Sequence, residues 1–92
     1  METGRAQGSR AESTRMVRGV LPVAGERVLL TEAAGYQFFR RDRWLVVVRT
    51  EEAWTEGNAI LVGRWAEGDE EAGRWTREWV RVAGLVVARC SS

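Results

Sequence analysis

The chain has 92 residues, of which 45% are hydrophobic and 29% are charged, and its formal net charge is +1. This length fits one domain at most, and the composition is that of an ordinary globular protein. Apolar runs such as Leu45–Val48 are far too short to cross a membrane, so we expect no membrane partner.

Residues 1–19 are rich in Gly, Ser, Thr, Arg and Glu, and apart from Met1 their only large apolar residues are Met16 and Val17. Such a segment buries too little apolar surface to offset its ordering entropy, so we expect a flexible basic tail. It lacks the apolar stretch of about 7–15 residues that a secretory signal needs. We therefore expect a cytoplasmic protein whose folded domain covers residues 20–92.

Short apolar and β-branched runs alternate with turn-like segments through the rest of the chain, which is typical of an all-β domain. The runs predict strands over residues 27–30, 44–48, 59–65 and 85–89. The connections between them are a long loop with embedded aromatic residues, a turn ending in Gly57 and Asn58, and an acidic loop. These connections cover residues 31–41, 51–58 and 67–73, respectively.

Residues 74–82 fit two patterns. In a helix, Trp75, Trp79 and Val82 would share one stripe and both indoles would be buried. In a strand, Trp75, Arg77, Trp79 and Arg81 would share one side instead. The Trp, Thr and Val content favours the strand, as does the position before a last apolar run. We expect the strand and keep the helix as an alternative.

Five short strands separated by glycine-containing turns predict a small, mostly antiparallel barrel or a strongly bent sheet. The segment Val23–Leu30 has an apolar-x-Gly-acidic pattern, and Trp79–Val87 has the pattern of strand, tight turn and strand. Both segments resemble the first strand and the last hairpin of SH3-like barrels. The resemblance implies a five-stranded SH3-like barrel and supplies no functional residues. The expected core consists of Val28, Leu30, Leu45, Val47, Ile60, Val62, Val80, Val82, Leu85 and Val87.

Catalysis has little support in this sequence. The chain has no histidine, which is the usual general base near neutral pH and the commonest metal ligand. Its single cysteine, Cys90, excludes an internal disulfide and a multi-cysteine zinc site, and suits a reducing compartment. Paired carboxylates fall only in expected loops. We therefore expect no enzyme, no metal and no cofactor.

Aromatic and arginine side chains dominate protein interfaces, and this chain has five tryptophans, more than a narrow barrel can enclose. We expect a non-catalytic module that binds a protein or peptide partner. Trp54 either covers the barrel mouth or contacts a partner, and the Trp75–Arg81 side either covers the barrel or forms a contact surface. The candidate residues are Tyr36, Phe39, Arg40, Arg41, Trp54, Trp75, Arg77, Trp79 and Arg81.

The alternative function is accessory nucleic-acid binding through Arg40, Arg41 and Arg43, assisted by the basic tail. Arginines next to aromatic rings can contact phosphates and stack on bases. The near-zero net charge counts against this alternative, because nucleic-acid-binding proteins are usually basic. An exposed strand edge would also allow association between copies of the chain.

Overall fold

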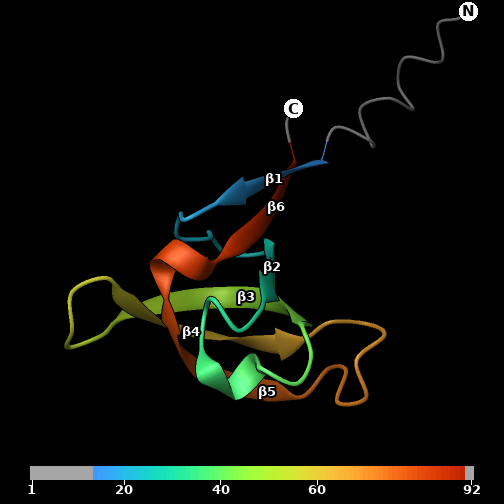
Figure 1. Ribbon diagram of the computed structural model, residues 1–92. Helices are drawn as coiled ribbons and strands as arrows, with labels where there is room; N and C mark the ends of the chain where they lie inside the picture. The colour runs from blue at the N-terminus through green and yellow to red at the C-terminus, as the bar shows by residue number, and fades with distance from the viewer. Residues whose placement is uncertain (1–13, 91–92) are drawn as a thin grey trace, which may run out of the picture.

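The computed structural model describes residues 14–90, which form one six-stranded antiparallel sheet with the strand order β1-β6-β2-β3-β4-β5 (Figure 1). Two short 3₁₀ turns, η1 and η2, lie in the connections. No described helix is long and apolar enough to cross a membrane. The elements are β1 (Thr14–Arg18), β2 (Arg27–Leu30), η1 (Tyr36–Phe38), β3 (Arg43–Glu52), β4 (Asn58–Trp65), β5 (Trp75–Arg81), η2 (Val82–Gly84) and β6 (Val86–Cys90).

The expectation of a closed five-stranded barrel is wrong in two respects, since the sheet has a sixth strand and is open. The additional strand, β1, lies within the predicted tail and pairs with β6 from Thr14 to Arg18. Its side chains are mostly exposed. It therefore joins the sheet through its main chain, which a search for buried apolar alternation does not detect. Residues 1–13 of the predicted tail lie outside the described residues.

The other predicted strands are confirmed, including the ambiguous one. Residues 75–81 are extended and pair with β4, which excludes the helix. β3 runs to Glu52, farther than predicted, because it pairs with β4 as far as Ala59. The acidic segment after β4 is a loop, as expected.

The core lies on one face of the sheet, here called the inner face. Directly paired residues share a face, and the pairs Val87–Val28, Val28–Leu45 and Leu45–Trp65 carry the inner face across four strands. Eight of the ten expected core residues are buried. The complete buried cluster is Val28, Leu30, Ala34, Phe38, Leu45, Val47, Leu61, Trp65, Val80, Leu85 and Val87; Val62 is buried as well.

The two exceptions are Ile60 and Val82, which are only half buried. Val82 lies in η2 rather than in a strand. In β4 the register places Leu61 on the inner face, so the expected inward direction of Ile60 and Val62 is wrong. A bulge between Val47 and Arg49 shifts the pairing of β3 with β4 at this point.

The long loop before β3 folds back against β5. Phe38 enters the core, and the carbonyl of Ala34 accepts a hydrogen bond from the Arg81 N–H at 2.8 Å. The side chain of Gln37 donates to the Trp79 carbonyl at 3.0 Å. In Figure 1, η1 lies in front of the sheet near β5. The loop thus covers one end of the β5 edge.

Candidate binding surface

The face of the sheet opposite the core, here called the outer face, carries a row of paired residues from four strands. Arg27 pairs with Val46, Val46 with Arg64, and Arg64 with Trp75. Two arginines of this face lie over indole rings of neighbouring strands. The Arg64 guanidinium is 4.6 Å from the Trp75 ring centroid, and that of Arg27 is 5.2 Å from Trp44. These contacts combine a cation and a large ring in one surface.

The β5 candidates all project from the outer face, as the strand prediction implied. Trp75 and Trp79 are 56% and 42% exposed. Arg77 donates to Glu51 of β3 at 2.9 Å. The Arg81 guanidinium instead donates to main-chain carbonyls of the preceding long loop, at 3.1 and 3.2 Å, and so helps to hold that loop.

Trp54 joins this group from the loop between β3 and β4. It is 95% exposed, and its ring meets Trp79 edge to face with the centroids 6.3 Å apart. It does not fold over the core, so the covering role considered for it is wrong. Trp54 and Trp79 together present two adjacent indoles to solvent.

The outer face has an excess of positive charge that the net charge of the chain conceals. Among the described strand residues of this face there is one carboxylate, Glu51, which bonds to Arg49 and Arg77. These two arginines hold the pKa of Glu51 below its ordinary value. The outer-face arginines are Arg18, Arg27, Arg49, Arg64, Arg77 and Arg81.

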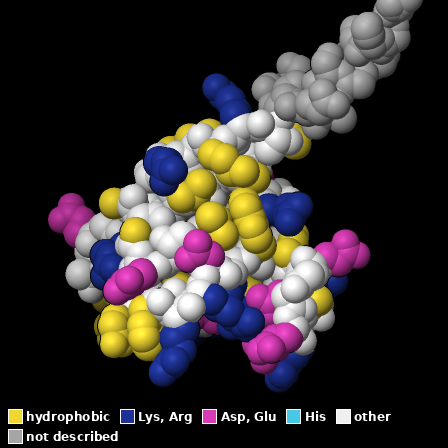
Figure 2. Space-filling model, turned by 45° about the vertical axis from the view of Figure 1, so that its right-hand side comes forward, with side chains coloured by type: hydrophobic (Ala, Val, Ile, Leu, Met, Phe, Trp, Pro, Cys, Tyr) yellow, Lys and Arg dark blue, Asp and Glu magenta, His cyan; other side chains and the backbone are white. Residues whose placement is uncertain are grey.

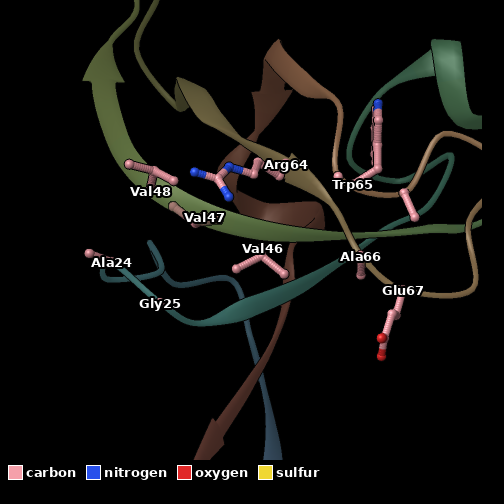
Figure 3. Close-up of a pocket in the computed structure, with 11 residues that line it drawn as sticks. Ala24, Gly25, Val46, Val47, Val48, Arg64, Trp65, Ala66 and Glu67 are labelled. Atoms are coloured by element: carbon pink, nitrogen blue, oxygen red, sulfur yellow. The ribbon is translucent and has the colours of Figure 1, made fainter.

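An apolar groove of about 670 Å³ crosses the outer face next to Arg64. It is lined by the β3 segment from Val46 to Val48, by the Ala24–Gly25 turn, and by Trp65 and the loop after it, which contributes Ala66, Glu67, Ala72 and Gly73. Figure 3 shows the Arg64 side chain extending along the sheet toward Val48. The groove therefore combines a mostly apolar lining with one arginine, Arg64, and one carboxylate, Glu67.

The aromatic candidates of the long loop form a second, separate group. The rings of Tyr36 and Phe39 stack with centroids 4.8 Å apart and planes 7° apart. Arg40 lies over the Phe39 ring at 5.1 Å. Both rings are exposed. Gln37, which lies between Tyr36 and Phe39 in the chain, donates to the Trp79 carbonyl, so this loop group lies beside the covered end of β5.

Arg43, the first residue of β3, is bound to the acidic loop. The Arg43 guanidinium lies 3.6 Å from the Trp65 ring centroid and donates to both carboxylate oxygens of Asp69, at 2.9 and 3.0 Å. It also donates to Glu71 at 2.8 Å. Hydrogen bonds from Arg43 lower the pKa of Asp69 from 3.8 to about 2. Arg43 thus fixes the acidic loop against the core.

Arg41 forms a more exposed ion pair with Glu70 at 3.2 Å. Figure 2 shows arginine and acidic side chains lying next to one another in the lower part of the molecule. Of the three arginines proposed for nucleic acid, Arg40 alone has no carboxylate partner among the described residues. The local charge of this cluster is therefore largely neutralised.

The sequence interpretation missed the outer-face residues Trp44, Val46 and Arg64. Their signal was the alternation of strands 44–48 and 59–65, which assigns every second residue to this face. Assigning Val62 to the core concealed the outward direction of Arg64, two residues farther along the same strand.

Comparisons of the chain with protein-family models, curated proteins and solved structures found no match. No group of three or more metal-ligating side chains occurs among residues 14–90.

Proposed function

We propose that this chain is a non-catalytic binding module that recognises a protein or peptide partner through the tryptophans and arginines of its outer face. The observation that carries the proposal is the exposure of Trp54, Trp75 and Trp79 on one side of the sheet, next to arginines. Large exposed apolar patches usually mark interaction sites, and Trp and Arg are the residues that contribute most to interfaces.

The charge of the outer face favours an acidic partner segment. Glu51 is shared by two arginines, whereas Arg27 and Arg64 have no carboxylate partner among the described residues. Complementary charge speeds association and selects among partners. The groove beside Arg64 supplies room for an apolar side chain of such a segment. The preferred partner is thus a peptide with acidic residues around an apolar anchor.

We propose that β2 to β6 form an open SH3-like sheet to which β1 adds a strand. The long loop after β2 and the 3₁₀ turn before β6 support this relation. The relation concerns the architecture and assigns no ligand.

A display library of random short peptides tests the proposed function. Peptides selected on the wild-type chain are measured against Trp79→Ala, with Tyr36→Ala as the matched control in the separate loop group. Truncating an interface tryptophan is expected to weaken binding by about 30-fold, which corresponds to about 2 kcal/mol. Tyr36→Ala is expected to leave binding within about 3-fold of wild type. Equal binding by the wild type and Trp79→Ala would contradict the proposal.

Nucleic-acid binding through Arg40, Arg41 and Arg43 remains the alternative proposal, with less support. Arg41 and Arg43 would have to exchange carboxylates for phosphates. Retention of the chain on a single-stranded oligothymidine column tests it. Retention that falls steeply with salt, and falls again in Arg40→Ala, would support the alternative. No retention at low salt would exclude it.

A further inference from the structure

The edge of β5 that faces away from β4 carries main-chain donors and acceptors that could pair with the same edge of a second copy. The Arg81 N–H and the Trp79 carbonyl both bond to the long loop, so the odd-numbered residues of β5 direct their main-chain groups away from β4. The same alternation places the N–H and C=O of Trp75 and Arg77 at this edge. No described residue provides a hydrogen-bond partner for these four groups.

The unpaired stretch has defined ends. On one side, Gln37 bonds to the Trp79 carbonyl. On the other side, the Arg74 carbonyl accepts from the Trp65 N–H at 3.1 Å, and the Gly73 N–H donates to the Trp65 carbonyl at 2.8 Å. An added strand can therefore pair only with the segment centred on Thr76.

We propose that two copies of this chain associate through this edge, antiparallel, with Thr76 on the two-fold axis. In this register Trp75 of one copy lies opposite Arg77 of the second copy, and the two residues exchange both of their main-chain hydrogen bonds. The two equivalent pairs use all four unpaired groups and no group that is already bonded. The two six-stranded sheets become one continuous sheet.

The side chains fit the same register. On the outer face, each Trp75 lies opposite an arginine, which allows a cation–π contact across the new pair of strands. On the inner face, Arg74 of one copy lies opposite Glu78 of the other. The Arg74 side chain is 73% exposed and pairs with Glu71 of its own copy at 3.1 Å, an exposed ion pair that it can exchange for one with Glu78 of the second copy. Opposite charges across antiparallel strands are stabilising.

The neighbouring symmetric registers fail. A shift toward the end of β5 places Arg77 of one copy directly opposite Arg77 of the second copy. It also requires the Trp79 carbonyl, which already accepts a hydrogen bond from Gln37. A shift toward the start requires the N–H of Gly73, which is bonded to Trp65. The two Arg77 side chains that face each other in the first of these registers would also repel, because like charges directly opposite each other are destabilising. The edge therefore specifies one register.

The first test separates the main chain from the side chain at one position. Arg77→Pro removes the N–H that points away from β4, a position where an edge strand tolerates proline. Arg77→Ala removes the same side chain but keeps the N–H. Dimerisation is measured by sedimentation equilibrium of the full chain. Protein concentrations from about 10 μM to about 1 mM bracket the dissociation constant expected for a small interface.

We expect a monomer–dimer equilibrium that Arg77→Pro weakens by about 10- to 100-fold relative to Arg77→Ala, because two hydrogen bonds are lost per dimer. Circular dichroism confirms that both variants stay folded. A wild-type chain that stays monomeric overturns the proposal. So does a dimer that is equally stable in both variants, because its interface then lies elsewhere. Larger assemblies overturn it too, since a two-fold contact closes at the dimer.

The second test concerns the register. Arg74→Glu places glutamates opposite each other in the proposed dimer, and Glu78→Arg places arginines opposite each other. Each variant alone is expected to associate at least about 10-fold more weakly than the wild type, and an equimolar mixture is expected to restore the dimer as a heterodimer. A mixture that associates no better than its components overturns the register. This inference needs no external partner, so its outcome is independent of the proposed function.

Discussion

Two groups of arginines in this chain have opposite surroundings. Arg41 and Arg43 lie close together in the sequence and are bound by the acidic loop. Arg27 and Arg64 lie far apart in the sequence, yet both belong to the outer face and lie over tryptophans. Arg41 and Arg43, which are close in the sequence, thus form a structural clamp with the acidic loop, whereas arginines that are far apart in the sequence gather on one surface. The pairing of strands determines which arginines remain available to a partner.

The strongest test of this comparison is Arg43→Ala. The side chains of Arg43 and Asp69 are only 18% and 8% exposed, so the substitution leaves a sheltered carboxylate without its partner and uncovers Trp65. We expect a loss of about 3 kcal/mol in the free energy of unfolding, measured by urea denaturation.

Arg41→Ala is the matched control, because its pair with Glu70 is exposed. Exposed ion pairs contribute about 0.5 kcal/mol or less, so this variant should unfold close to the wild-type urea concentration. Equal losses in the two variants would show that the clamp does not depend on Arg43.

The clamp also predicts a pH dependence. The pKa of Asp69 is about 2 in the folded chain, below its ordinary 3.8. A carboxyl whose pKa is lowered by folding stabilises the fold above its unfolded pKa, and this contribution is lost as the pH falls toward the folded pKa. We expect Asp69 to contribute about 2 kcal/mol at neutral pH and progressively less between about pH 4 and pH 2.

Asp69→Asn isolates this contribution from the other carboxyl groups. The stability difference between the wild type and Asp69→Asn, measured by urea denaturation, should be largest at neutral pH and shrink through the acid range. A difference that stays constant with pH would mean that the charge of Asp69 is not what Arg43 recognises.

Most of the strands, and the outward-facing residues of β5, could be predicted from local pattern. Residues 75–81 were recognised from their Trp, Thr and Val content, because β propensity reflects a half-buried pleated surface. β1 could not be recognised in this way, since its contribution is a main-chain ladder with few buried side chains. The bulge after Val47 was equally hidden, and so was the register that places Leu61 rather than Ile60 on the inner face.

The candidate site was only partly visible for a related reason. Trp75, Arg77 and Trp79 lie on one strand, so a period of two identifies their common face. The row that joins Arg27 to Arg64 depends on the register of three strands. The neutralisation of Arg43 depends on Asp69, which is 26 residues away in the chain. Long-range pairing of this kind has no local sequence signal.

Apart from the Arg41→Ala control, the smallest expected effect concerns the outer face. Arg64→Ala removes the cation over Trp75, and we expect a loss of about 0.5–1 kcal/mol in the free energy of unfolding. Arg64→Lys keeps the charge without the planar stacking group, so it should fall between the wild type and Arg64→Ala. The loss in each variant should not change between neutral pH and about pH 3, because arginine keeps its charge throughout this range.

Quenching of tryptophan fluorescence by iodide gives a second readout of the same substitution. Iodide is an anion, so removing the positive charge beside Trp75 should reduce its quenching relative to that by neutral acrylamide. The substitution therefore changes the surface far more than the fold. If Arg64→Ala instead destabilised the chain as much as Arg43→Ala, the outer-face arginines would also be structural. The distinction between clamp and surface would then be lost, because neither group would be available to a partner without a cost to folding.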